Sequence, residues 1–396
     1  MNWKAVLIIL TCSVVLMSAS YTMLIPFLPM YLINELGVSN EHVNLWSGII
    51  FSVTFIFSAI MAPIWGKLSD KKGRKPMVIR SGIGLAITYF ICGTVSSPIH
   101  LLFARILQGF AAGLWPAELA IMSSYAPKEK LGFCMGVMQG ALTAGGVIGP
   151  LLGGVLASVF GMRISFFIAA GALALITVIT MIFIKEPPRE EKTPEQIALA
   201  QQAGKVNLLK KPVIRRMLLC AIVIQMAILI MEPILTLYVA QLHHSMENVV
   251  MLSGMIFSLS GFAGAIASPL WGRYGQSSGF LRTMYISLAG TGVIRVLQAV
   301  PTNLVLFAVL QFASGLFYAG VYPSINSILV NNSDTEQRGR IFGLMFSAQQ
   351  IGCTIGPLAG GLIGTVLGLR YVFLFGGILL FITSAFMYFK PLKTQI

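Results

Sequence analysis

The sequence predicts an all-α membrane protein of twelve transmembrane helices, arranged as two similar halves of six. Of its 396 residues, 56% are hydrophobic and only 10% are charged, whereas a soluble globular domain carries about 25% charged residues. The apolar runs are long enough to cross a bilayer, which takes about 20 residues in a helix. They are rich in glycine and lack the alternation of a membrane β-barrel, so a helical bundle is the expected fold.

The distribution of positive charge predicts the topology. The formal net charge is +14, and the 27 lysines and arginines lie almost wholly in alternate loops and at the two ends of the chain. Basic loops of membrane proteins stay in the cytoplasm, where they face anionic lipid headgroups. This pattern places both termini in the cytoplasm and explains the charge without nucleic-acid binding.

The expected helices follow the apolar runs along the chain. The first run continues through Pro26 and Pro29 without a small-residue cleavage site, so we expect a retained transmembrane helix rather than a signal peptide. The twelve expected spans are 5–33, 43–66, 77–96, 100–125, 132–158, 163–184, 217–241, 249–271, 282–300, 304–329, 340–366 and 370–389.

The densest block of charge is the short loop between the second and third spans. It contains Gly66, Asp70, Gly73 and Arg74. A small residue such as Gly66 lets helix backbones approach closely, Asp70 can face a helix N-terminus, where negative charge is favoured, and Arg74 can pair with a carboxylate. The alternative is a basic topology anchor, which would need neither the aspartate nor the two glycines.

The longest polar segment divides the spans six and six. It predicts an N-terminal half at residues 1–184, a cytoplasmic linker at 185–216 and a C-terminal half at 217–396. We expect the linker to be solvated, although Glu195–Ala203 has the composition of a short surface helix.

The two halves repeat each other in sequence. Residues 148–151, IGPL, recur as IGPL at 355–358, an offset of 207 residues (357 minus 150), and Pro26 recurs as Pro233 at the same offset. Two six-helix halves of like orientation place a substrate site between them near the bilayer midplane. Rocking of the halves then gives alternating access to that site.

Three motifs resemble the major facilitator superfamily, and the likeness extends over essentially the full chain. Residues 66–75, GKLSDKKGRK, resemble the signature between spans two and three, and 105–109, RILQG, resemble the basic motif of span four. Residues 145–154, GGVIGPLLGG, resemble the span-five motif of drug:proton antiporters. The whole pattern is similar to bacterial multidrug efflux proteins of the MdtG and PmrA type.

The resemblance implies a role for each motif. The charged loop would be a latch that closes the cytoplasmic side in the outward-facing state, and Arg105 would take part in proton coupling. The span-five motif would seal the contact between spans five and eleven and favour export. Its residues are Gly145, Gly149, Pro150, Gly153 and Gly154.

Four charged residues lie at least five residues from either end of a predicted span, where charge is costly and therefore a functional hypothesis. They are Arg105, Glu118, Glu232 and Arg295. Glu232 precedes Pro233 and its repeat counterpart is Ile25, so the internal symmetry does not require a carboxylate there. It is the first candidate for a proton carrier or a site for a cationic drug, with a hydrogen-bonded neutral glutamate as the alternative. Glu118 and Arg105 are further candidates, and Arg295 is expected to snorkel to the interface.

The predicted function is proton-coupled export of lipophilic or amphiphilic drugs from the bacterial plasma (inner) membrane by a monomer. An exporter of one metabolite, such as a siderophore or an organic acid, remains an alternative on the same scaffold, with Arg105 and Arg295 holding the anion. No nucleophile with a base, no phosphate loop and no cofactor motif supports an enzyme. The five cysteines lie in apolar runs, and His243 and His244 lack a further ligand nearby, so no metal site is expected.

Overall fold

The structure is a computed structural model that describes residues 2–186, 208–246, 248–333 and 338–389, without the side chains of Asp70, Lys128 and Arg338. The surface helix expected at Glu195–Ala203 lies outside these residues. Within the described ranges every regular element is a helix.

The first half of the chain folds into helices that follow the predicted spans. They are α1 (Trp3–Thr22), α2 (Leu28–Asn34), α3 (Val43–Lys72), α4 (Arg74–Thr94), α5 (Pro98–Ala111), α6 (Leu114–Tyr125), α7 (Leu131–Phe160) and α8 (Met162–Phe183), with a 3₁₀ turn, η1 (Lys128–Lys130), before α7.

The second half follows the same plan. Its helices are α10 (Pro212–Leu229), α11 (Leu235–His243), α12 (Val249–Ser278), α13 (Phe280–Leu297), α14 (Leu304–Tyr318), α15 (Val321–Asn331), α16 (Arg338–Val366) and α17 (Leu369–Phe389), with 3₁₀ turns η2 (Leu208–Lys210) and η3 (Glu232–Ile234).

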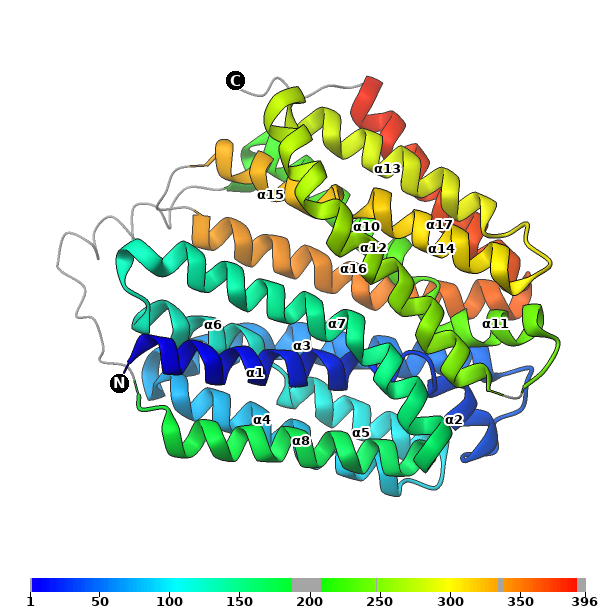
Figure 1. Cartoon of the computed structure of the whole chain (residues 1–396), viewed down its shortest axis with the longest axis horizontal. Coiled ribbons are helices and arrows are strands. Elements are labelled where there is room, and N and C mark those ends of the chain that lie inside the picture. Colours follow the sequence, from blue (N-terminus) through cyan, green and yellow to red (C-terminus); the bar gives the residue numbers. More distant parts are fainter. Residues whose placement is uncertain (1, 187–207, 247, 334–337, 390–396) are drawn as a thin grey trace. The chain divides into compact units, whose positions relative to one another are not determined.

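The helices form two compact units (Figure 1). Unit 1 comprises Met1–Pro188 and Pro233–Ser258, and unit 2 comprises Arg189–Glu232 and Leu259–Ile396. The whole of α11 and the first ten residues of α12 thus belong with the N-terminal helices, because they pack on them. Thr236 donates a hydrogen bond to the carbonyl of Pro26 at 2.6 Å, and Ser258 donates to that of Val147 at 2.6 Å.

Helix packing inside the units repeats as the sequence does. In unit 1, α1 packs along α7 and α4 along α8 (Figure 1). In unit 2, the corresponding helices α10 and α13 pack along α16 and α17. The breaks repeat as well, because α1 is separated from α2 around Pro26 and α10 from α11 around Pro233.

Eleven described helical segments are long and apolar enough to cross a membrane. The fourth predicted span, 100–125, is instead two shorter helices, α5 and α6, because the chain breaks at Ala112 and Gly113. Gly113 has φ 116°, a conformation that suits glycine. Arg80 of α4 donates to the carbonyls of Ala112 at 2.9 Å and Phe110 at 3.2 Å, so the break leaves these acceptors bonded. This role of Arg80 was not predicted from sequence.

Candidate functional site

The predicted loop at residues 66–75, which we call the gate loop, is helical except at Gly73, because α3 continues to Lys72 and α4 begins at Arg74. It is held by contacts within unit 1. Gly73 has φ +103° and connects the two helices without an intervening turn. The Arg74 guanidinium donates to the carbonyl of Ala120 and to the Ser124 hydroxyl, both in α6. The side chain of Asp70 lies outside the described part. A Cβ on Gly66 would meet no described atom within 4 Å, so the close approach expected there is not seen.

Glu186, which was predicted only as part of the linker, contacts the gate loop. Its carboxylate accepts the backbone N–H groups of Arg74 at 2.7 Å and Lys75 at 2.8 Å. These groups open α4, where the helix dipole favours negative charge. A Cβ on Gly73 would lie 2.6 Å from the Glu186 Oε1 atom. Glu186 follows α8 directly in the sequence. Its contact with α4 could have been predicted only if the packing of α8 along α4 had been known.

The span-five motif lies on α7, and its glycines contact two helices of unit 1. A Cβ on Gly145 or Gly149 would lie 2.5 Å from a backbone carbonyl of α1, and one on Gly153 would lie 2.3 Å from the carbonyl of Met23 just beyond it. On another side of α7, a Cβ on Gly154 would lie 3.0 Å from Met251 of α12, whose Gly254 faces the Pro150 carbonyl. These glycines therefore allow α1 and α12 to pack closely on α7.

The corresponding glycines of the second half lie on α16, and they contact α10. A Cβ on Gly352, Gly356 or Gly360 would lie under 3.0 Å from a backbone carbonyl of α10 or of the residue after it. The predicted seal between spans five and eleven joins helices of different units and stays a prediction.

Arg105 lies on α5 and is only 2% exposed. Its Nη1 donates to Gln108 Oε1 at 2.7 Å, and its Nε donates to the carbonyl of Ile50 at 3.4 Å. The guanidinium lies 5.8 Å from the ring centre of Phe51. Among the residues with described side chains it forms no ion pair, so its positive charge is balanced only by dipoles and an aromatic ring.

Glu118 lies on α6 and is fully buried. Its Oε1 atom accepts a hydrogen bond from the Ser13 hydroxyl of α1, while its Oε2 atom has no hydrogen-bond partner among the described atoms. The partners of Glu118 and of Arg105 lie on different helices, so the structure does not join these two predicted residues in one hydrogen-bonded group.

Glu232 opens η3 at the break between α10 and α11. Arg295 of α13 interacts electrostatically with it and donates to the carbonyl of Ala227 in α10 at 3.0 Å. Arg295 is only 7% exposed, so the expectation that it snorkels to the interface was wrong. Its guanidinium instead lies inside unit 2, where it donates to the Ala227 carbonyl and contacts the Met231 sulfur at 2.6 Å, with no described ion pair to Glu232.

Further polar side chains of unit 2 surround this pair. Tyr318 interacts electrostatically with both Glu232 and Arg295, and Cys353 with Glu232. The Tyr322 hydroxyl donates to Gln225 Oε1, and its ring packs edge-on against that of Tyr318. We call these residues the C-terminal polar cluster: Gln225, Glu232, Arg295, Tyr318, Tyr322 and Cys353. These contacts could not be predicted from sequence, because they depend on the rotation of each helix about its own axis, which apolarity alone does not determine.

The arrangement can hold and release a proton. A carboxyl group at a helix break beside a buried arginine can change charge as the helices move. The described residues contain no group of three His, Cys, Asp or Glu side chains placed to hold a metal ion.

Comparison with known proteins gives the family. The family model described as Major Facilitator Superfamily matches residues 10–264 and 249–395. The multidrug resistance protein MdtG of Proteus mirabilis (strain HI4320) is 34% identical over 398 residues, which cover 100% of this chain and 96% of that protein. MdtG of Escherichia fergusonii is 36% identical over 379 residues, covering 94% and 91%.

Solved structures share the fold at low sequence identity. A D-xylose–proton symporter superposes with a TM-score of 0.81 at 14% identity, covering 100% of this chain and 99% of that one. A bacterial homologue of the human lysosomal transporter Spinster, in an inward-facing and occupied conformation, has a TM-score of 0.81 at 16% identity, covering 98% and 96%. The all-α membrane fold predicted from sequence is confirmed, and the chain belongs to the major facilitator superfamily of transporters.

Proposed function

We propose that this chain exports lipophilic or amphiphilic drugs in exchange for protons, by alternating access, as a monomer in the bacterial plasma (inner) membrane. The observation that carries the proposal is identity of 34–36% over nearly the whole chain to relatives named multidrug resistance protein. The matched region extends through both units, so the likeness is not confined to one half of the scaffold. Fold likeness alone would not distinguish export of drugs from other transport.

Proton coupling is assigned to Glu232. The charged carboxylate is attracted to Arg295 across α10 and α13, and this attraction disappears when the carboxyl binds a proton. Because Glu232 begins the break between α10 and α11, its protonation loosens that break from α13. Charged residues inside a membrane protein pair with one another and commonly mark proton relays. Arg105 and Glu118 are assigned supporting roles in unit 1.

The gate loop is assigned the role of a latch on the cytoplasmic side, with both termini on that side. Its support is the set of bonds that join the start of α4 to α6 and to Glu186. The expected partners are a small-molecule substrate, protons and membrane lipids, and the chain is expected to catalyse no chemical reaction.

The test is proton movement in proteoliposomes that hold an imposed pH gradient. Cationic drugs are expected to trigger proton flux with wild-type protein, and Glu232→Gln is expected to abolish it because the amide cannot bind and release a proton. Glu35→Gln is the matched control, since Glu35 pairs with Arg163 at the surface. Normal flux in Glu232→Gln at all pH values would refute the coupling assignment.

The same assay distinguishes the second candidate function. Arg105 forms no ion pair with a described carboxylate, which is the one observation that favours an anionic substrate. Saturable flux with a single organic anion, and none with cationic drugs, would assign the chain to export of one metabolite.

A further inference from the structure

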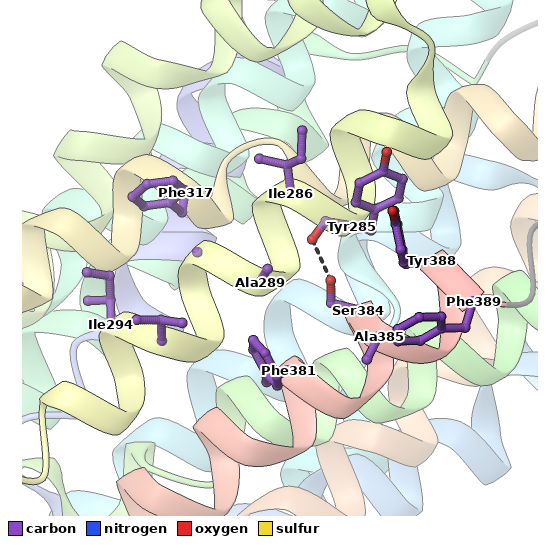
Figure 2. A pocket seen from close by; sticks show the side chains of 12 residues that line it. Tyr285, Ile286, Ala289, Ile294, Phe317, Phe381, Ser384, Ala385, Tyr388 and Phe389 are labelled. Atoms are coloured by element: carbon purple, nitrogen blue, oxygen red, sulfur yellow. Dashed lines mark hydrogen bonds between the residues drawn. The ribbon is translucent and has the colours of Figure 1, made fainter.

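A groove in unit 2 lies outside the site described above. It has a volume of about 610 Å³ and is formed by α13, α14 and α17. Figure 2 shows Tyr285, Tyr388 and Phe389 at one end and Ile294 and Phe317 at the other. The Ser384 hydroxyl in its wall donates to the Tyr285 carbonyl at 2.6 Å, so this polar group is already bonded and the lining is apolar.

We propose that this groove binds one acyl chain of an anionic phospholipid from the leaflet at the basic end of the helices, with its phosphate at Arg282. The inference does not depend on the proposed function, because it requires only that unit 2 lies in a bilayer.

The length of the groove fits one leaflet. Tyr285 and Ile294 lie nine residues apart on α13, which corresponds to about 14 Å along a helix. One leaflet of the hydrocarbon core is about 15 Å thick. The groove therefore runs from the interface almost to the bilayer midplane, as the acyl chain of a lipid does.

The two ends of the groove differ in polarity, as expected if one end lies at the membrane interface and the other lies near the bilayer midplane. Tyr285 and Tyr388 pack edge-on with ring centres 5.4 Å apart, and Tyr388 is 59% exposed. Tyrosine is enriched at the membrane interface, where its ring is buried and its hydroxyl is hydrated. The deeper end contains Val293, Phe317 and Phe381, which have no polar side-chain atom. A headgroup thus fits only at the tyrosine end.

Arg282 supplies charge complementarity at that end. It is exposed in the first turn of α13. Residues three and four apart share a helix face, so Arg282 lies one turn beyond Tyr285 and Ile286 on the groove side. No described hydrogen bond or ion pair occupies its guanidinium, which matches phosphate oxygens in a bidentate way. Basic pockets between helices at this membrane surface bind anionic headgroups.

The depth of the groove arises from small side chains. Ala289, Gly290 and Ala385 line it, and a Cβ on Gly290 would lie 2.2 Å from the Phe317 ring. An empty groove in a bilayer would lose dispersion contacts along its walls, and helix faces in lipid gain no hydrophobic force from closing it. An acyl chain restores these contacts.

The test uses the full-length protein in nanodiscs that contain phosphatidylglycerol with a diazirine near the end of one acyl chain. Labelling is expected to be several times stronger in α13 and α17 than in the lipid-facing α8, which contacts only exchanging bulk lipid. Ala289→Trp fills the groove and is expected to remove this labelling, whereas Ala174→Trp, the same change at an exposed position of α8, is expected to preserve it. Equal labelling of α8 and α13 in wild type would overturn the proposal.

Arg282→Gln tests the headgroup without changing the groove. Its preference for phosphatidylglycerol over phosphatidylethanolamine, measured by native mass spectrometry, is expected to fall about fivefold, the equivalent of about 1 kcal/mol for one arginine at an anionic surface. An unchanged preference would contradict the proposed phosphate contact. Displacement of the label by a lipophilic drug, with no effect of Arg282→Gln, would identify the occupant as a transport substrate and refute the lipid assignment.

Discussion

Arg105 and Arg163 lie in the same unit but in different surroundings. Arg163 pairs with Glu35 at 2.8 Å, and the two side chains are 35% and 33% exposed. An exposed pair contributes about 0–1 kcal/mol. Arg105 is almost fully buried and directs its guanidinium to Gln108 and to the Ile50 carbonyl. The planar fork of arginine reaches two acceptors in fixed directions, which the point charge of lysine does not.

We therefore expect Arg105→Lys to reduce drug-driven transport about tenfold or more, because the loss of one charge-assisted hydrogen bond costs about 1.5–3 kcal/mol. Initial transport rates in proteoliposomes measure this effect. Arg163→Lys is the matched control and is expected to transport at close to the wild-type rate. If the two variants lose transport equally, the burial of Arg105 carries no functional meaning.

At the level of elements, the packing of α7 depends on where its glycines lie. A Cβ on Gly149 would lie 2.0 Å from the Thr22 hydroxyl and 2.5 Å from the Ala19 carbonyl. On the same helix, a Cβ on Gly136 would meet no described atom within 4 Å. We therefore expect a glycine-to-alanine substitution to affect stability differently at Gly149 and at Gly136.

Gly149→Ala is expected to destabilise the folded protein by about 1–3 kcal/mol, the usual effect of overpacking. Gly136→Ala is expected to be neutral or to stabilise the helix by up to about 1 kcal/mol. Thermal unfolding of the two purified variants in one detergent compares them directly. A Gly149→Ala protein as stable as Gly136→Ala would show that α7 and α1 are not packed this closely.

The start of α4 gives a second prediction at this level. Glu186→Ala removes the acceptor of the Arg74 and Lys75 N–H groups, which is expected to cost about 0.5–2 kcal/mol, as for loss of a helix N-cap. Hydrogen exchange of the first turn of α4 is then expected to accelerate. Glu129→Ala, at an exposed residue of η1, is the control and is expected to leave that exchange unchanged. Unaltered exchange in Glu186→Ala would show that Glu186 does not stabilise the start of α4.

For the whole molecule, the sequence predicted those features that depend on local composition or on the internal repeat. The spans follow from apolarity. The break between α10 and α11 was not predicted, because residues 217–241 were expected to form one continuous span. The partners of Arg295 and Glu186 did not follow, because each pairing joins two helices whose rotation about their axes is set by packing. Arg80 was missed for the same reason, since its role appears only when α4 lies beside the break between α5 and α6.

The break between α5 and α6 determines the membrane topology of all later helices, because the two helices cross the bilayer either as one span or not at all. Helices α5 and α6, 14 and 12 residues long, together reach about 39 Å, which exceeds the hydrocarbon core of about 30 Å. A broken helix is tolerated in a membrane only if its freed backbone groups are bonded. Arg80 bonds the Phe110 and Ala112 carbonyls, and the Trp65 indole also donates to Phe110 at 2.9 Å. We therefore expect α5 and α6 to cross the membrane as one span.

Cysteine labelling tests this expectation, because one additional crossing places every later loop on the opposite side of the membrane. Between Lys72 and His243 the chain crosses five times if α5 and α6 form a span (α4, α5–α6, α7, α8 and α10–α11) and four times if they do not. In a Cys12→Ser background, which removes the exposed cysteine, Lys72→Cys is expected to react only from the cytoplasm and His243→Cys only from outside. Glu41→Cys, one span before Lys72, is the reference for the outer side. Reaction of His243→Cys from the cytoplasm would place the two chain ends on opposite sides and leave eleven spans.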